Sequence, residues 1–118
     1  MKIRLEAHGA ATLVIPEGRL DFGAAAGFQA QLEQVLAGTP TAPTAVIIDC
    51  AGLEYVSSAG LRVFLLAART SQRAGLRFAV CSLQPAVREV FELSGFSRVI
   101  PMHTDRVAAL APLAPGPA

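Results

Sequence analysis

The sequence has little charge, and its charge is nowhere concentrated. Charged residues make up 16% of the 118 residues, and ten Lys and Arg against nine Asp and Glu give a formal net charge of +1. The chain contains no basic block and no interleaving of basic with aromatic residues, which argues against a nucleic-acid partner. Because apolar residues account for 53% of the sequence, we expect one compact domain with a single core.

The sequence also lacks the segments that carry proteins into or across membranes. The first ten residues, MKIRLEAHGA, alternate charged with apolar residues and contain no continuous apolar run of the kind found in signal peptides. No later stretch reaches the roughly 18 apolar residues that are needed to span a bilayer. These absences predict a cytoplasmic protein that does not insert into membranes.

Residues that could support catalysis or bind a metal are few and scattered. Cys50 and Cys81 lie far apart, each at the end of a strand-like run, and are interpreted as small buried hydrophobic residues. His8 and His103 have no partner at a metal-ligand spacing, and there is no Gly-rich phosphate loop of the G-x-x-x-x-G-K type. We therefore expect no metal, no other cofactor and no enzymatic activity.

The periodicity of apolar residues predicts an α/β fold. Two strand-like segments flank Gly9-Ala10, which predicts an antiparallel hairpin. After the hairpin, stretches with apolar residues at helical spacing alternate with short, continuously apolar runs that are typical of buried strands. The expected strands are 2–8, 12–16, 44–50, 76–83 and 98–101, and the expected helices are 24–37, 58–73, 84–94 and a short one from Thr104.

The order of these elements predicts how the strands pair. Two consecutive strand–helix–strand units require parallel strands with right-handed crossovers. Together with the hairpin they predict a mixed sheet of about five strands with about four helices, in one domain over residues 1–111. The Pro-rich residues 112–118 are predicted to form a flexible tail.

The stretch EYVSSAGLRV joins a predicted buried strand to a predicted helix. Ser57 and Ser58 are of a residue type preferred at helix N-caps, which accounts for one of the two serines. No capping box is present, because Gly60 and Leu61 stand where Glu or Gln would complete one. A glycine inside a first turn costs up to about 1 kcal/mol relative to alanine. Gly60 therefore predicts that another group packs closely against its backbone.

Two functional interpretations of the serines can be weighed from the residues alone. A nucleophile elbow of the G-x-S-x-G type is excluded, because Val56 occupies the position of the first glycine and the chain is short for a hydrolase sheet. A regulatory switch is compatible, because a phosphate at a helix N-terminus faces free N–H groups and adds about −1.5 to −2 charges that can repel a partner. Spacing alone favours a helix cap over the switch.

Three stretches of the sequence closely resemble the STAS domain of bacterial anti-sigma factor antagonists, also called anti-anti-sigma factors. They are PEGRLDFGAAAGFQAQLEQVL, AVIIDCAGLEYVSSAGLRVFLLAARTSQRAG and LRFAVCSLQPAVREVFELSGFSRVI, and together they cover nearly the whole chain. The most specific element is a strand ending at Asp49, followed by GLEYVSSAG and an apolar helix.

The resemblance implies a mechanism of partner switching. In this family the unphosphorylated antagonist binds an anti-sigma factor, which is itself a serine kinase of the histidine-kinase-like ATPase fold, and so releases a sigma factor. The kinase phosphorylates the serine two positions before the glycine, which breaks the complex, and a PP2C-type phosphatase restores it. The matching residue is Ser58, and Ser57 is the less favoured acceptor. Many members carry Asp at the position of Ser57, so a kinase that recognises that negative charge would phosphorylate this protein poorly.

The resemblance also implies a partner-binding surface around this serine. Asp21 and Asp49 match acidic positions near the family's phosphosite, although turn capping is an alternative role for both. In a helix that starts at Ser58, Arg62 and Leu66 lie on a stripe turned away from the apolar face of Leu61, Phe64, Leu65 and Ala68. This stripe, which continues through Arg69 and Arg73, is either a solvated basic face or part of a docking surface. The docking surface would comprise Asp21, Asp49, Ser57, Ser58, Ala59, Gly60, Arg62 and Leu66, with Arg62 pairing to an acidic group of the kinase.

A second function is compatible with the same resemblance. STAS domains also serve as accessory subunits of ABC-type lipid transporters and as parts of stress-signalling assemblies, where phosphorylation is not required. The identity of the bound ATPase distinguishes these alternatives.

Overall fold

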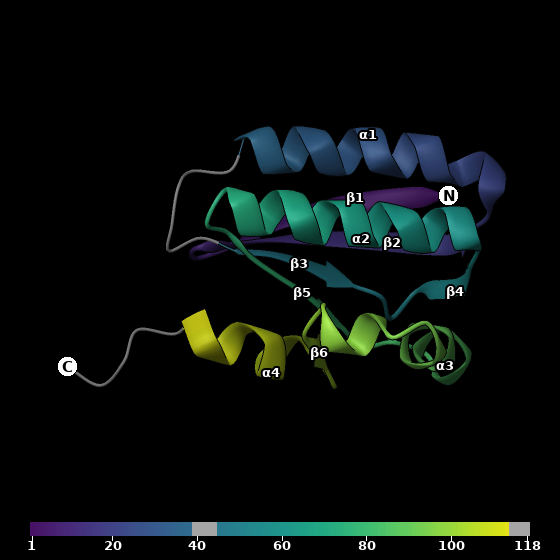
Figure 1. Cartoon of the computed structure of the whole chain (residues 1–118). Coiled ribbons are helices and arrows are strands. Elements are labelled where there is room, and N and C mark those ends of the chain that lie inside the picture. Colours follow the sequence, from purple (N-terminus) through teal and green to yellow (C-terminus); the bar gives the residue numbers. More distant parts are fainter. Residues whose placement is uncertain (39–44, 114–118) are drawn as a thin grey trace.

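The structure is a computed structural model that describes residues 1–38 and 45–113. Its elements follow the α/β order predicted from the sequence (Figure 1). The predicted tail lies mostly outside the described residues, as does the segment 39–44. The strands are β1 (Lys2–His8), β2 (Ala11–Leu20), β3 (Ala45–Asp49), β4 (Leu53–Val56), β5 (Arg77–Cys81) and β6 (Met102–His103). The helices are α1 (Phe22–Gly38), α2 (Ser58–Arg73), α3 (Pro85–Leu93) and α4 (Arg106–Leu110), with 3₁₀ turns η1 (Phe96–Arg98) and η2 (Ala111–Leu113).

The sheet is mixed, as predicted, and its strand order is β1-β2-β3-β5-β6. β1 and β2 form the predicted antiparallel hairpin, with Gly9 at a φ of +58° in the turn, where a residue without a side chain is favoured. β2, β3, β5 and β6 are parallel to one another. The two strand–helix–strand units therefore have the parallel pairing that was predicted from the order of their elements.

One strand, β4, was not predicted from the sequence. It has only four residues and pairs in parallel with Gly18–Leu20 of β2, beyond the segment of β2 that pairs with β3. β2 is correspondingly longer than the predicted 12–16, because its last residues have a partner of their own. The described chain thus has six strands. A run as short as LEYV carries too little periodicity to be identified as a strand.

The predicted strand over residues 98–101 is wrong. Residues 96–98 form the 3₁₀ turn η1, and the parallel strand β6 begins only at Met102. Ile100 is fully buried, and its N–H donates to the carbonyl of Phe96 at 2.8 Å. Ile100 therefore packs into the core without being part of a strand, whereas its neighbour Val99 is 55% exposed.

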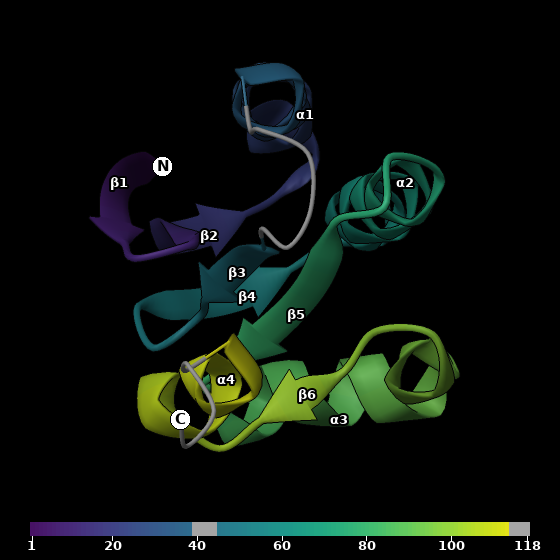
Figure 2. The same ribbon diagram turned by 90° about the vertical axis from the view of Figure 1, so that its left-hand side faces the viewer.

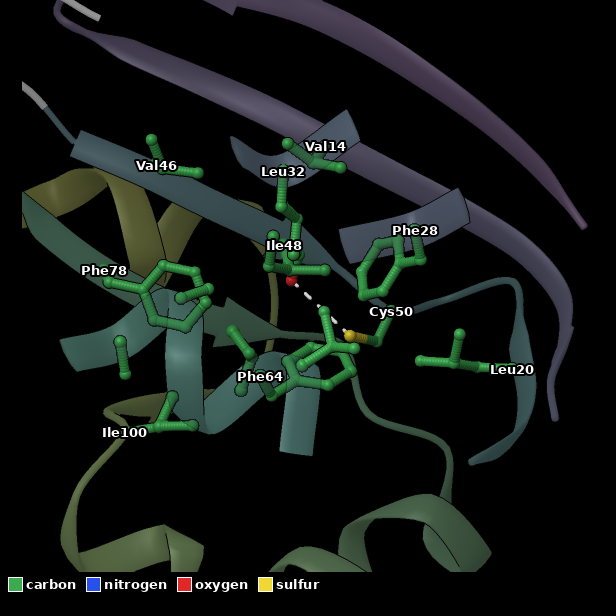
Figure 3. Close-up of a cluster of buried hydrophobic side chains, with 14 of the residues drawn as sticks. Val14, Leu20, Phe28, Leu32, Val46, Ile48, Cys50, Phe64, Phe78 and Ile100 are labelled. Carbon is green, nitrogen blue, oxygen red and sulfur yellow. Dashed lines mark hydrogen bonds between the residues drawn. The ribbon is translucent and has the colours of Figure 1, made fainter. Parts of the chain in front are cut away.

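The two faces of the sheet are covered unequally. Three helices, α1, α2 and α3, pack on the larger core, in which the rings of Phe28 and Phe64 lie 5.5 Å apart (Figure 3). The ring of Phe91 from α3 lies 5.1 Å from that of Phe64. A smaller cluster, which includes Leu13, Ile47 and Ala109, lies on the opposite face beneath α4. Figure 2 shows α1 and α2 on one side of the sheet and α4 on the other.

The face that α2 buries differs in part from the predicted one. Phe64 and Ala68 are buried as expected, whereas Leu61 and Leu65 are only partly buried. Val63 and Ala67 take their place in the core. The reason is that α1 lies beside α2, as Figure 1 shows, so the helix is covered from its flank as well as from the sheet.

Both cysteines are buried and free, as their positions at strand ends predicted. Within the described ranges, no helix has both the length and the apolar character needed to cross a membrane.

Candidate functional site

The candidate site is the serine joint, residues 57–60, where β4 ends and α2 begins. The N–H of Ser57 donates to the carbonyl of Leu20 at 2.8 Å, which extends the pairing of β4 with β2 by one residue. Ser57 itself is extended, with φ −82° and ψ 171°. The joint is therefore fixed to the end of β2 before the helix starts.

Ser57 is the N-cap of α2. Its Oγ accepts the N–H of Gly60 at 3.1 Å, and its carbonyl accepts the N–H of Leu61 at 2.9 Å. The predicted capping role is thus confirmed and belongs to Ser57. Ser58 is the first helical residue and is exposed, and its hydroxyl has no hydrogen-bond partner among the residues that the structure describes.

Gly60 explains why the first turn of α2 lies so close to the sheet. A Cβ at this position would stand 2.6 Å from Cγ of Leu20 and 3.0 Å from Cγ2 of Val56. The predicted close approach is confirmed, and the groups responsible are side chains at the ends of β2 and β4. The missing side chain at Gly60 thus lets the turn that carries Ser57 and Ser58 lie directly against the ends of these two strands.

Asp21 directly precedes α1 and follows the end of β2 that the serine joint contacts. Its Oδ1 accepts the N–H of Ala24 at 2.9 Å, so the carboxylate caps the first turn of the helix. It is exposed and follows Leu20, the residue whose carbonyl binds Ser57. The structure therefore places Asp21 beside the serine joint and gives it the capping role that was its alternative interpretation.

The carboxylate of Asp49 is directed elsewhere. It ends β3, is only 4% exposed, and accepts the N–H of Ala51 at 3.1 Å. Its second oxygen accepts from Nε of Arg106, whose Nη1 pairs with Glu6 at 2.9 Å. The hydrogen bond to Asp49 raises the pKa of the Arg106 guanidinium, and the charges of both carboxylates act in the same direction. Asp49 thus faces α4, on the side of the sheet opposite α2.

A shallow groove runs between the first turns of α1 and α2. Arg62 and Ala59 line it on one side and Phe22 on the other. Phe22 is 84% exposed, which is unusual for a phenylalanine. Phe22 was not among the predicted site residues, because the helix was expected to start at Ala24. Its position directly after a capping aspartate was the available signal.

The basic stripe of α2 continues away from this groove. Arg62, Arg69 and Arg73 are exposed, and no ion pair to them occurs within the described part of the chain. Leu66 is partly buried and lines a hollow next to Glu33 of α1. It lies outside the core cluster, at the boundary between the stripe and α1. The stripe thus combines unpaired cations with one accessible apolar side chain.

The family model for the STAS domain matches residues 2–109, and the chain belongs to this family. BtrV of Bordetella bronchiseptica, assigned as an anti-sigma factor antagonist, is 47% identical over 66 residues, which make up 56% of this chain and 57% of that protein. The alignment thus spans little more than half the length of that relative. The anti-sigma F factor antagonist of Paenibacillus polymyxa is 24% identical over 96% of this chain and 95% of its own length.

Solved structures share the fold. An anti-sigma factor antagonist from Mycobacterium paratuberculosis superposes with a TM-score of 0.82 at 22% identity, covering 97% of this chain and 94% of that one. The anti-sigma factor antagonist SpoIIAA in its unphosphorylated form superposes with a TM-score of 0.79 at 21% identity, covering 98% of this chain and all of its own. At such identities the likeness establishes the shared architecture.

Proposed function

We propose that this chain is a cytoplasmic anti-sigma factor antagonist that acts by partner switching. In its unphosphorylated form it binds and sequesters an anti-sigma factor serine kinase of the histidine-kinase-like ATPase fold, which releases a sigma factor. Phosphorylation of Ser58 ends the binding, and a PP2C-type phosphatase restores it. The observation that carries this proposal is the division of roles at the joint, where Ser57 caps the helix and Ser58 presents a free hydroxyl.

The local electrostatics make Ser58 a suitable acceptor. As the first residue of α2, it stands at the positive end of a helix of 16 residues whose first turn contains no acidic side chain. A phosphate there meets free backbone N–H groups, so the modification leaves the fold intact. It adds about −1.5 to −2 charges at a residue that carried none, which repels an acidic group of a partner that binds there.

The docking surface that we propose surrounds Ser58. Ala59 and Arg62 follow it on α2, the Phe22 ring and the exposed Asp21 adjoin it from α1, and Leu66 lies one turn beyond Arg62. Arg62 pairs with an acidic group of the kinase. Three residues act indirectly, because Ser57 and Gly60 hold the turn in place and Asp49 anchors α4.

The names and known states of the relatives support this proposal. Several are named as antagonists of anti-sigma factors, and SpoIIAA has been solved in both an unphosphorylated and a phosphorylated form.

The test is a reconstitution of the wild type and three variants with the cognate anti-sigma factor kinase and ATP. We expect one phosphate on Ser58 of the wild type, located by mass spectrometry. Ser58→Ala should bind the kinase and resist release, and Ser58→Asp should bind weakly because a carboxylate carries part of a phosphate's charge. Ser57→Ala is the matched control. It removes the cap and about 0.5 to 2 kcal/mol of stability, yet keeps the acceptor.

Two results would contradict the proposal. Equal kinase binding by the wild type, Ser58→Ala and Ser58→Asp would leave Ser58 without a switching role. Capture of a transporter ATPase from the native cells, with no phosphate on either serine, would instead favour the accessory-subunit function.

A further inference from the structure

β1 forms a free edge of the sheet. Among the described residues it pairs with β2 alone, and Figure 2 shows no element beyond it. The opposite edge is the two-residue strand β6, so the seven residues of β1 are much the longer edge. An edge strand presents a row of unpaired N–H and C=O groups that can pair with another strand.

The two sides of β1 differ in character. Side chains alternate along a strand, so Lys2, Arg4, Glu6 and His8 share one side, and Ile3, Leu5 and Ala7 share the other. On the charged side, Arg4 pairs with Glu17 at 3.0 Å, and Glu6 pairs with Arg106. On the apolar side, Ile3 packs against the larger core, whereas Leu5 remains 54% exposed. Leu5, at the centre of the free edge, is thus an apolar side chain that remains largely exposed to solvent.

We propose that two copies of this chain associate through β1, in antiparallel register about a twofold axis at Leu5. The two sheets then form one continuous sheet, and Leu5 packs against Leu5 of the second copy. Arg4 lies opposite Glu6 of the second copy, and the reverse pair forms by symmetry. Negative and positive side chains then alternate across the contact. Glu17 and Arg4 of one copy are followed by Glu6 and Arg106 of the second copy.

The charge pattern selects this register over its neighbours. An axis at Arg4 would place that arginine opposite Arg4 of the second copy, and an axis at Glu6 would place the two Glu6 carboxylates opposite each other. Like charges directly opposite each other destabilise a strand pair, whereas opposite charges stabilise it. An axis between two residues would bring charged side chains onto the apolar side. The axis at Leu5 pairs opposite charges and lies at the centre of the strand, so all seven residues of β1 have a partner.

The experiment is sedimentation velocity of the full chain at protein concentrations up to about 1 mM, because a contact of two short strands falls in the small, weak class of interfaces. The wild type should show a sedimentation coefficient that rises with concentration toward that of a dimer. Leu5→Asp should remain monomeric, because the twofold axis brings the two carboxylates together. Val107→Asp is the matched control, since Val107 is 77% exposed on α4 and the charge change is the same.

A cysteine at position 5 tests the geometry directly. Directly opposed residues of an antiparallel pair have Cα atoms about 4.5 to 5.5 Å apart, within the range that a disulfide bridges. Both native cysteines are buried, so mild oxidation should link Leu5→Cys into a covalent dimer and leave Val107→Cys largely monomeric. A wild type that stays monomeric throughout, a Leu5→Asp variant that dimerises like the wild type, or equal cross-linking of the two cysteine variants would overturn the proposal.

Discussion

Arg106 in the first turn of α4 holds the carboxylate of Asp49 at the end of β3, 57 residues earlier in the chain. The same guanidinium binds Glu6 of β1, so one cation joins three elements. Because the Asp49 carboxylate is almost completely removed from water, its hydrogen bonds come from this partner and from the N–H of Ala51. The pair therefore fixes the position of α4 on the smaller core.

Arg106→Gln should lower the free energy of unfolding by about 2 kcal/mol, because it leaves a buried carboxylate without its cation. Adding Asp49→Asn should restore part of this loss, since the buried charge is then removed. Urea denaturation measures both. Arg88→Gln is the control, because it breaks an ion pair with Glu92 in which both side chains are half exposed, and it should cost less than about 1 kcal/mol. Equal losses for Arg106→Gln and Arg88→Gln would show that Asp49 does not need its cation.

Gly60→Ala should destabilise the protein by about 1 to 2 kcal/mol, although alanine is the better helix former. The new methyl group would stand 2.6 Å from the buried Leu20 side chain, and the strain of overpacking exceeds the gain in helix propensity. Gly27→Ala in α1 is the matched control, because no atom lies within 4 Å of its added Cβ, and it should stabilise by up to about 1 kcal/mol. Thermal melts of both variants decide the sign, and stabilisation by both would contradict the close packing at Gly60.

Leu66→Asp should weaken binding of the kinase while the protein remains folded. Leu66 lies outside the core cluster, so the carboxylate reaches water, at a cost of about 1 kcal/mol from lost contacts and from the nearby Glu33. Leu93→Asp, at an exposed leucine of α3, introduces the same charge and should leave binding unchanged. Circular dichroism checks the fold and a pull-down checks binding. Unfolding of Leu66→Asp would place this leucine in the core.

Stability should fall as the pH rises above about 8.5, the usual pKa of a cysteine in an unfolded chain. Burial raises the pKa of Cys50 well above this range, and the nearby Cys81 and Asp49 add to the effect. Burial likewise raises the pKa of Cys81. The folded protein keeps both thiols protonated while the unfolded chain loses these protons, so alkaline pH favours unfolding. Urea titrations between about pH 7 and 10 should show this slope, and it should flatten in the Cys50→Ala, Cys81→Ala double variant.

Much of the architecture could be predicted from local patterns. Helix α2 begins and ends where its composition indicated, because the Ser-Ser joint and Gly75 are strong boundary signals on either side of a periodic apolar run. β3 was predicted as a strand covered on both faces, and all five of its residues are buried. The close approach at Gly60 was also predictable, because a glycine in a helix has a local cost that packing must offset.

The sequence alone therefore determined the class of fold, the position of the serine joint and the family resemblance, because these depend on patterns among residues that are close together in the sequence. Only the tertiary structure assigned the cap to Ser57, directed Asp49 toward α4, and created β4 and β6. These features depend on partners distant in sequence. Ser57 needs the carbonyl of Leu20, Asp49 needs the guanidinium of Arg106, and β4 and β6 need the backbone groups of β2 and β5 with which they pair. A two-residue or four-residue strand has no stability of its own, so the neighbour that supplies its hydrogen bonds decides whether it exists.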